Sequence, residues 1–304
     1  MESVIVILKQ LATMAIYCLI GFCLHKKGLV IKEGCRAFSR LLLYVILPCV
    51  IINSFLREAS PDVTKTLIIC IAVSALLLML SMLISKLAFP KDAIAMFSAS
   101  FSNAGFMGIP LITLVYGSEL VLYIAPFVAL LNILQWIYGQ NLLLGKKQSS
   151  IRDILGNPLV VAFAVGLLFY ALPVSLPELL QKPIAALAGC NAPVAMIILG
   201  YYLAEVPLRR FICAKDAWKV SAVRLLAVPV LTVLVLAWLP GLAAPVKMAL
   251  IIAASAPVGI NVAIYAELLG KDYQKAVTMI CSSSVLCLLT LPLIILLTNT
   301  LICG

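Results

Sequence analysis

The apolar residues of this chain come in long uninterrupted runs and do not alternate with charged residues. Eight runs lack Asp, Glu, Lys and Arg, and each is long enough to cross a hydrocarbon core as one helix, which takes about 20 residues. They are residues 66–85, 93–118, 120–145, 154–177, 183–204, 225–246, 248–266 and 276–304. Two shorter runs, 10–24 and 41–56, become spans when the flanking Lys9, Arg40 and Arg57 extend to the membrane surface. The pattern predicts an all-α membrane protein with ten transmembrane helices.

Composition agrees with this pattern. Of the 304 residues, 64% are hydrophobic and only 11% are charged, and the mean hydropathy is +1.18. A soluble domain carries more than twice that charge fraction. The first span does not resemble a cleaved signal peptide, because Glu2 precedes it and no small-residue cleavage site comes before His25. We therefore expect it to remain as the first helix.

The net charge of +10 lies in short loops between the spans, so it indicates orientation and not nucleic-acid binding. Alternate loops differ sharply in basic residues. One set holds Lys26, Lys27, Lys32, Arg36, Arg40, Lys86, Lys91, Lys146, Lys147, Arg152, Arg209, Arg210, Lys215, Lys219, Lys271 and Lys275, and the other holds Lys9, Arg57, Lys65, Lys182 and Lys247. By the positive-inside rule the first set is cytoplasmic, so both termini are expected on the outer side of a cytoplasmic membrane.

Neither a metal site nor a cofactor site is expected. The cysteines, at positions 18, 23, 35, 49, 70, 190, 213, 281, 287 and 303, show no CxxC or Cys/His spacing. We interpret them as small buried apolar residues. The single histidine, His25, is expected to be an interfacial side chain, with a proton relay as the less favoured alternative.

The chain also has the pattern of a duplication, with five spans on each side of a basic loop. Gly21 and Gly166 are separated by 145 residues, Pro48 and Pro193 by 145, and Pro110 and Pro257 by 147. We predict a first five-helix repeat over 1–144, a cytoplasmic linker over 145–153 and a second repeat over 154–304, within one membrane domain. Because five is odd, the second repeat enters the membrane from the opposite side, and such inverted repeats are typical of secondary transporters.

The fourth and ninth spans each contain an interruption. The fourth holds Ser100-Phe-Ser-Asn-Ala-Gly-Phe-Met-Gly-Ile-Pro110, and the ninth holds Ser255-Ala-Pro-Val-Gly-Ile-Asn261. Proline cannot donate to the carbonyl four residues back, and glycine releases the backbone from helical angles. Interruptions at matching places in two halves indicate a transporter binding site, although a kink that only packs helices is the alternative.

The interruptions also suggest the sign of the ligand. Each exposes the N-terminus of a half-helix, whose free N–H groups favour an anion such as a carboxylate. A polar stripe in the fifth span, at Asn132, Gln135 and Trp136, shares one helix face and adds donors. The candidate substrate-binding residues are Asn103, Gly105, Gly108, Pro110, Asn132, Gln135, Ser255, Pro257, Gly259 and Asn261. Asn53, Ser54 and Asn191 are weaker candidates.

Several of these segments together resemble the auxin efflux carrier family of ten-helix permeases. The resemblance covers essentially the whole chain and is carried by Tyr44-Val-Ile-Leu-Pro48, Asn103 to Pro110, Asn157-Pro158 with Gly166, Ala192-Pro193 to Ala204, and Ala256-Pro257 with Asn261. It implies a fold like that of bile-acid symporters and sodium/proton antiporters, in which helices 4 and 9 cross at their prolines. Helices 1, 2, 6 and 7 then form a scaffold, and members work as homodimers that carry organic anions. Between helices 5 and 6 this chain lacks the long loop of the plant carriers.

The sequence therefore predicts a secondary transporter for a small organic anion that works by alternating access in the lipid bilayer. Arg224 lies about one and a half turns inside helix 8. No Asp or Glu lies at the centre of a span, since Glu205 and Glu267 lie near cytoplasmic ends. This weighs against the alternative of a cation-coupled symporter, antiporter or channel. Backbone carbonyls at the interruptions can still hold a cation, so H+ or Na+ coupling stays open. An enzyme is not expected, because HExxH, a mid-span Asp pair and a Ser/His pair are all missing.

Overall fold

The computed structural model describes residues 2–145, 156–172, 176–207, 209 and 213–303, and every regular element in these ranges is helical. The first half contains α1 (Glu2–Lys26), α2 (Lys32–Leu41), α3 (Leu47–Phe55), α4 (Pro61–Ala88), α5 (Ala93–Ser100), α6 (Ile109–Tyr116), α7 (Val121–Leu134) and α8 (Gln140–Leu144). The second contains α10 (Pro158–Ala171), α11 (Glu178–Gly189), α12 (Asn191–Glu205), α14 (Lys215–Ala222), α15 (Val228–Trp238), α16 (Ala244–Ser255), α17 (Asn261–Leu268) and α18 (Tyr273–Thr298). The predicted linker lies outside the described residues after Gly145.

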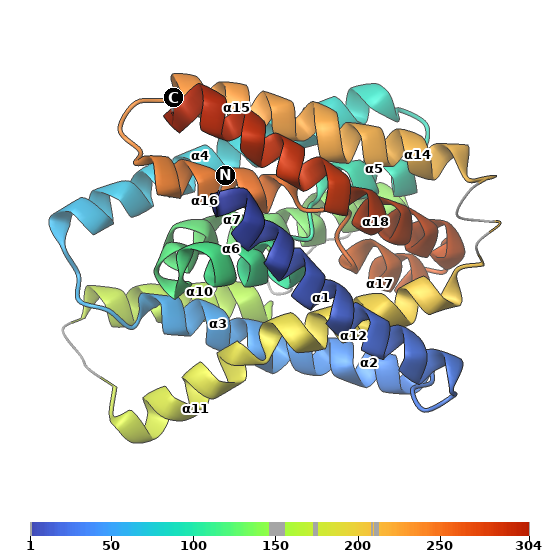
Figure 1. Ribbon diagram of the computed structural model, residues 1–304, viewed down its shortest axis with the longest axis horizontal. Coiled ribbons are helices and arrows are strands. Elements are labelled where there is room, and N and C mark those ends of the chain that lie inside the picture. Colours follow the sequence, from blue (N-terminus) through green and yellow to red (C-terminus); the bar gives the residue numbers. More distant parts are fainter. Residues whose placement is uncertain (1, 146–155, 173–175, 208, 210–212, 304) are drawn as a thin grey trace.

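Several of these helices continue into one another through short π-helical turns. Such turns, at Leu42–Ile46, Gln135–Gly139 and Val223–Ala227, join α2 to α3, α7 to α8 and α14 to α15. In the described residues, six helical segments are then long and apolar enough to cross a membrane: Lys32–Phe55, Pro61–Ala88, Ser118–Leu144, Glu178–Glu205, Lys215–Trp238 and Tyr273–Ile302. Four shorter apolar segments, Ala12–Lys26, Ala104–Tyr116, Pro158–Ala171 and Ala244–Ser255, take the places of the other predicted spans. Figure 1 shows both termini toward the same end of the bundle.

The starts of four helices are encoded by capping side chains. Ser60 Oγ accepts from Val63 N at 3.3 Å at the start of α4, and Asn157 Oδ1 accepts from Leu159 N at 2.9 Å at the start of α10. In both cases a proline follows the cap, where its missing N–H is not needed. Asp92 and Asp272 cap α5 and α18 in the same way. These polar residues end the connecting loops and fix where each apolar helix begins.

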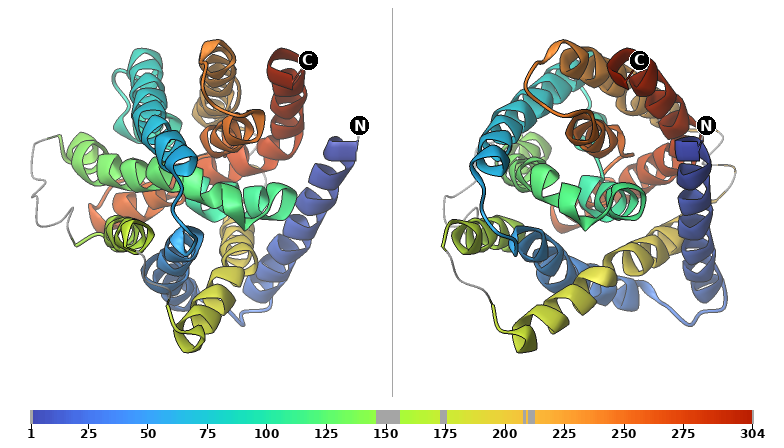
Figure 2. Two further views of the ribbon diagram at one scale, coloured as in Figure 1. Left: turned by 90° about the vertical axis from the view of Figure 1, so that its left-hand side faces the viewer. Right: turned by 60° about the vertical axis from the view of Figure 1, so that its left-hand side comes forward.

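The helices form two packed groups, which Figure 2 shows on opposite sides of the molecule. Group I consists of α1, α2, α3, α10, α11 and α12, and its main internal contacts are α1 with α12 and α10 with α3. Group II consists of all other helices named above, including α4, α5 and α14 to α18. The two groups meet where α7 lies on α10, α6 on α1, and the turn before α6 on α12. Group I thus contains the predicted helices 1, 2, 6 and 7.

The closest approach inside group I depends on two glycines. A Cβ atom at Gly21 of α1 would overlap the backbone of Ile197, and one at Gly200 of α12 would overlap the carbonyl of Cys18. Small residues that bring helix backbones together are a common means of helix association in membranes. The α1–α12 contact is therefore a backbone-to-backbone contact without intervening side chains.

The contact between α3 and α10 is equivalent to the α1–α12 contact but uses different residues. Phe55 of α3 and Phe163 of α10 meet edge to face with ring centroids 5.6 Å apart, and they correspond to Gly200 and Cys18 at the separation of 145 residues. Gly166 lies against Phe55, as its counterpart Gly21 lies against Ile197. Pro48 and Pro193 each follow a helix discontinuity by two or three residues. Two of the three landmark pairs thus occupy equivalent places, which supports a duplication.

The third landmark pair does not occupy equivalent places, because the fourth span is interrupted at the start of the predicted stretch from Ser100 to Pro110 and not at Pro110. Helix α5 ends at Ser100, and Pro110 is already inside α6, which follows a π-helical turn at Ala104–Gly108. A proline in the first turn of a helix needs no N–H, so it does not interrupt the chain there. The residues paired at the interruptions are Ser102 and Val258, and only Pro257 lies in one. The two helices therefore do not cross at Pro110.

The cysteines of the described part are free thiols, but not all are buried. Cys35, Cys70, Cys281 and Cys287 are buried, whereas Cys23, Cys190 and Cys213 are exposed, and the side chain of Cys303 lies outside the described part. The prediction of burial is wrong for the three exposed residues, because among the described residues their side chains lie on the outer surface of the helix bundle. An apolar thiol on the outside of a membrane helix is as acceptable as one in the core. His25 packs against Tyr201 at a centroid distance of 4.6 Å.

We expect Gly21→Ala to destabilise the protein by about 1–3 kcal/mol, because the added methyl group cannot avoid the Ile197 backbone. The measurement is the thermal unfolding midpoint in detergent. Gly34→Ala in α2 is the control, because its Cβ would meet only Val30 Cγ1 at an ordinary 3.6 Å. Equal midpoints for the two variants would contradict the backbone contact.

Candidate functional site

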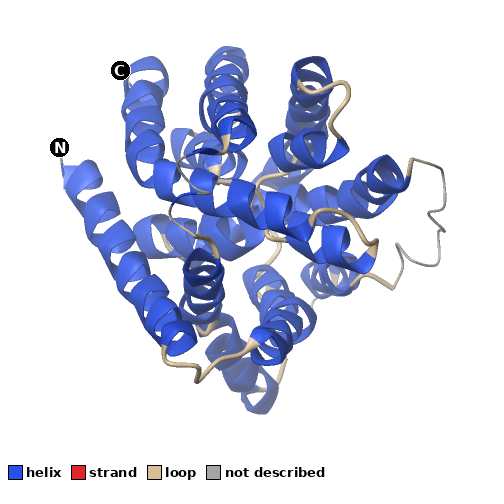
Figure 3. Cartoon of the chain, turned by 90° about the vertical axis from the view of Figure 1, so that its right-hand side faces the viewer, coloured by secondary structure: helices blue, strands red, loops and turns tan. Residues whose placement is uncertain are grey.

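The two interrupted spans meet at their interruptions. Phe101, Ser102 and Asn103 separate α5 from the turn before α6, and residues 256–260 separate α16 from α17; both segments belong to the loops that Figure 3 colours tan. Asn103 N donates to Pro257 O at 2.7 Å, and Gly259 N donates to Phe101 O at 3.1 Å. These antiparallel hydrogen bonds satisfy four backbone groups that the surrounding apolar residues cannot satisfy. We call this contact the crossing.

The C-terminal ends of α5 and α16, which enter the crossing, are capped by hydrogen-bond donors. Ser102 Oγ donates to Ala253 O at 2.8 Å, near the end of α16. Ser81 Oγ of α4 donates to Ser100 O at 2.7 Å, at the end of α5. Arg224, which is 1% exposed, donates to further carbonyls of both helices. The carbonyl ends of both half-helices are therefore closed to other ligands.

The N-terminal side of the crossing faces a small cavity. It has a volume of about 20 Å³, enough for one water molecule. Its lining includes Asn103 and Gly105 from the fourth span, Gln135 from the fifth, and Gly259 and Asn261 from the ninth. Leu43, Asn132 and Asn261 line both this cavity and a much larger one, of about 530 Å³. The small cavity at the crossing is therefore adjacent to the large one.

Two amide donors in the small cavity are buried without a hydrogen-bond acceptor among the described residues. They are Asn103 Nδ2 and Gln135 Nε2, on side chains 4% and 1% exposed. The other half of the Gln135 amide is used, because its Oε1 accepts from Asn261 Nδ2 at 2.6 Å. An unsatisfied buried donor costs about 1–3 kcal/mol, so this arrangement favours a ligand that brings acceptor oxygens.

The large cavity is cationic at its mouth and aromatic along its wall. Lys32, Arg36 and Arg40 of α2 line it together with a single acidic residue, Glu267 of α17. Glu267 Oε1 lies 2.5 Å from both Lys32 Nζ and Arg36 Nη2, and the side chains of Lys32 and Arg36 are 40% and 49% exposed. The net charge of the lining is positive, which raises the local concentration of anions.

Aromatic rings form much of the wall between the mouth and the crossing. Trp136 and Tyr265 meet edge to face at 5.6 Å, and α12 contributes Tyr201 and Tyr202. Lys32 Nζ lies over the Tyr273 ring at 4.6 Å from its centroid. Such a wall buries the apolar part of a ligand, while the amides beside the small cavity hold its polar part.

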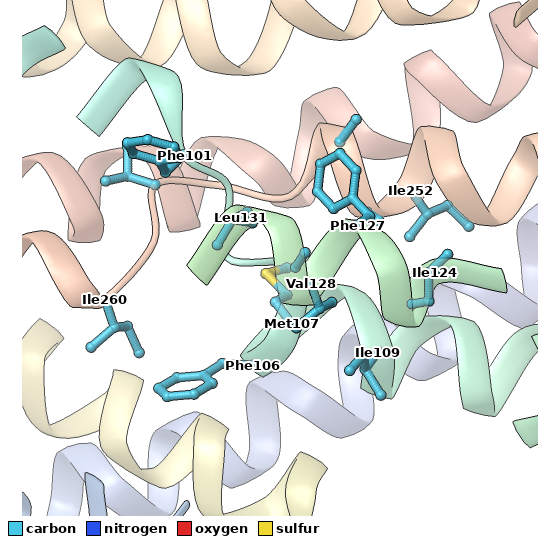
Figure 4. Close-up of a cluster of buried hydrophobic side chains, with 14 of the residues drawn as sticks. Phe101, Phe106, Met107, Ile109, Ile124, Phe127, Val128, Leu131, Ile252 and Ile260 are labelled. Atoms are coloured by element: carbon cyan, nitrogen blue, oxygen red, sulfur yellow. The ribbon is translucent and has the colours of Figure 1, made fainter. Parts of the chain in front are cut away.

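The structure brings six of the ten predicted site residues to the two cavities: Asn103, Gly105, Asn132, Gln135, Gly259 and Asn261. The other four lie behind the crossing. A Cβ at Gly108 would touch Ala253 Cα at 3.4 Å, Pro110 and Ser255 are buried in helices, and Pro257 presents its carbonyl to Asn103. Figure 4 shows the apolar side chains of this region, among them Met107, Ile109, Ile124, Val128 and Ile252. Gly108, Pro110, Ser255 and Pro257 therefore help to hold the interruptions in place.

The weaker candidates divide in the same way. Asn191 Nδ2 donates to Gly105 O at 3.3 Å and so reaches the crossing from group I. Ser54 Oγ donates to Ile51 O within its own helix, and neither Ser54 nor Asn53 lines either cavity. Asn132 Nδ2 donates to Val128 O at 2.8 Å, which leaves its carbonyl oxygen toward the pocket.

Sequence reasoning missed three parts of the site. Lys32, Arg36 and Arg40 were interpreted only as orientation charges, although their spacing of four residues places them on one helix face. Tyr201 and Tyr202 of α12 contribute to the family resemblance, but the sequence does not assign them to the site. Arg224 was noted as lying slightly inside a span, and that unusual depth was the available sign of a function.

Two comparisons with known proteins bear on the family of this chain. A protein-family model described as "membrane transport protein" matches residues 6–151 and again residues 146–295, which together cover nearly all of the chain. The match in two parts agrees with the duplication. A search of the curated proteins gives no match.

We expect Gly259→Ala to destabilise the crossing, because its Cβ would lie 3.2 Å from Ser102 O and 3.4 Å from Phe101 O. The cost is about 1–3 kcal/mol, measured as a lower unfolding midpoint in detergent. Gly105→Ala is the matched control in the same cavity, since its nearest contact would be Leu47 Cδ1 at 3.5 Å. If Gly105→Ala were the more harmful variant, the described geometry of the crossing would be wrong.

Proposed function

This chain belongs to the membrane transport protein family, also known as the auxin efflux carrier family, and we propose that it is a permease for a small organic anion, a carboxylate in particular. Family membership makes it a multi-pass secondary transporter and not an enzyme. The observation that carries the proposal is the pair of unsatisfied amide donors, Asn103 Nδ2 and Gln135 Nε2, in the small cavity that adjoins a cationic one.

The polarity of the crossing supports an anionic cargo. The C-terminal ends of α5 and α16 are capped by Arg224, Ser81 and Ser102. The N-terminal starts at Asn103 and Asn261 instead line the cavity. Helix N-termini carry partial positive charge and free N–H groups, which stabilise a carboxylate. The part of the crossing that the cargo can reach is therefore electropositive.

The size of the pocket supports a small molecule. A volume of about 530 Å³ falls within the usual range for small-molecule sites, whereas about 20 Å³ at the crossing holds no more than water. The cargo therefore rests in the larger cavity with its carboxylate directed toward Asn261, and it reaches the Asn103 and Gln135 amides through a water molecule in the small cavity. An aliphatic or aromatic remainder lies against Trp136 and Tyr265.

The architecture that we propose has ten spans in two inverted five-helix repeats, residues 1–144 and 154–304. Group I acts as the scaffold and group II moves against it, so the pocket opens alternately to each side. Contacts between the groups support this division: Glu267 of group II meets Lys32 and Arg36 of group I, and Tyr273 OH meets Glu205 Oε2 at 2.9 Å. Such contacts must break and re-form if the groups move.

The distribution of basic residues places this mouth on the cytoplasmic side. Both termini then lie outside a cytoplasmic membrane, as Figure 1 permits by showing them toward the same end. A homodimer is proposed on the family resemblance alone. The one acidic residue of the lining, Glu267, is already paired with two cations, which argues against a cation as the cargo.

In proteoliposomes, the purified protein should accelerate uptake of at least one radiolabelled mono- or dicarboxylate. Asn103→Ala and Asn261→Ala should each abolish it, since both amides line the small cavity. Asn53→Ala, which removes an amide away from both cavities, should transport normally. Transport of a cation with no response to any carboxylate would overturn the proposal.

We expect Glu267→Gln to raise the apparent affinity for the anion several-fold at low ionic strength, because Lys32 and Arg36 lose their counter-charge. The measurement is the KM for uptake at low and high salt. Glu178→Gln is the control, because it removes a carboxylate from an exposed pair with Lys182, far from the pocket. A weaker affinity in the Glu267→Gln variant would contradict an anionic cargo.

A further inference from the structure

We infer that Arg224 is a built-in cation for the crossing, which fills the place that a mobile coupling cation would occupy. The carrier then needs no Na+ at this position. The inference rests on the chain being a transporter, but not on the sign of its cargo. Arg224 acts as a positioning residue, because it does not line either cavity.

The guanidinium group contacts both interrupted spans at once. Arg224 Nη1 donates to Ala99 O at 3.2 Å and to Ser100 O at 3.3 Å, at the end of α5. Arg224 Nη2 donates to Ala254 O, at the end of α16. Nη1 also contacts Ser81 Oγ of α4 at 3.1 Å, which itself donates to Ser100 O. One side chain thus connects four helical segments.

The charge of Arg224 matches that of the helix ends. Each helix C-terminus carries about half a negative elementary charge, so two of them supply about one. Arg224 supplies one positive charge, and in the described part of the chain no carboxylate forms an ion pair with it. An uncompensated arginine in the middle of a membrane protein is unfavourable, so the two helix ends are its counter-charge.

The same carbonyl oxygens are the ligands that a coupling cation would need. Unwound or terminal carbonyls of broken helices are where transporters of this general design hold Na+. Here Ala99, Ser100 and Ala254 give their oxygens to Arg224, and Ala253 gives its oxygen to Ser102. A diffusible cation at these oxygens would have to displace a guanidinium that is fixed to α14–α15 by its own backbone.

The first test uses the unaltered protein. Its unfolding midpoint, and its uptake of whichever solute it carries, should stay the same within error when Na+ is replaced by choline at constant ionic strength. A specific stabilisation by Na+, or a dependence of uptake on Na+, would overturn the inference. This arm needs no variant, so it gives an answer even if substitutions at Arg224 fail to fold.

The second test removes the guanidinium group of Arg224. Arg224→Ala should lower the unfolding midpoint, and millimolar methylguanidinium should restore it, since this ion reproduces the missing group. Arg57→Ala, which removes an exposed arginine, should show no response to methylguanidinium. Arg224→Lys keeps the positive charge but lacks the planar guanidinium group with its several N–H donors. This variant should fold, with a stability between those of Arg224→Ala and the unaltered protein.

The outcomes separate a cation site from ordinary packing. Loss of stability in Arg224→Ala that methylguanidinium does not restore, together with an equally unstable Arg224→Lys, would show a packing role and overturn the inference. Unfolding measurements require no substrate. A failure to find any transported carboxylate therefore counts against the proposed cargo and leaves this result intact.

Discussion

The structure depends on how two broken helices satisfy their backbone polar groups where neither water nor lipid can do so. An unpaired N–H or C=O in such surroundings costs several kcal/mol. The crossing solves this with two backbone hydrogen bonds, between Asn103 and Pro257 and between Gly259 and Phe101. The serines at positions 81 and 102 and the arginine of α14–α15 cover the remaining carbonyls. Only the N–H side is left open, and the pocket lies on that side.

This division explains why residues that line the small cavity and residues that pack in the core lie within the same short segments. In the fourth span, Asn103 and Gly105 line the small cavity while Phe101 and Met107 are buried in the core. In the ninth, Gly259 lines the cavity while Val258 is fully buried and its N–H donates to Ser283 Oγ at 3.0 Å. Each interruption is therefore held rigidly from behind, and its donors are oriented before a ligand arrives. Pre-orientation of this kind lowers the cost of binding.

The sequence was sufficient for the helical architecture, the order of the apolar segments and the two interrupted spans, because uncharged run length and clustered Gly, Pro and Asn are local signals. It was not sufficient for the position of the first interruption. Pro110 was the strongest breaker in the span, yet it lies where a helix tolerates proline, and Phe101 to Asn103 carry no breaker at all. The arginine contacts were out of reach for another reason: its partners Ser81 and Ala99 are 143 and 125 residues away in the chain. Pairings at that separation are set by the tertiary fold alone.

The two equivalent interfaces of group I differ in their contacting residues. Glycine packs against backbone at α1–α12, and phenylalanine packs against phenylalanine at α3–α10. Two identical halves would give a carrier whose inward-open and outward-open forms have equal free energy. In the proposed alternating-access cycle, unequal halves remove that degeneracy, so the empty carrier favours one of its two forms. Microscopic reversibility still forbids any effect on the final concentration ratio across the membrane. In that proposed cycle the inequality acts on the kinetics, and half-saturation then occurs at different solute concentrations on the two faces of the membrane.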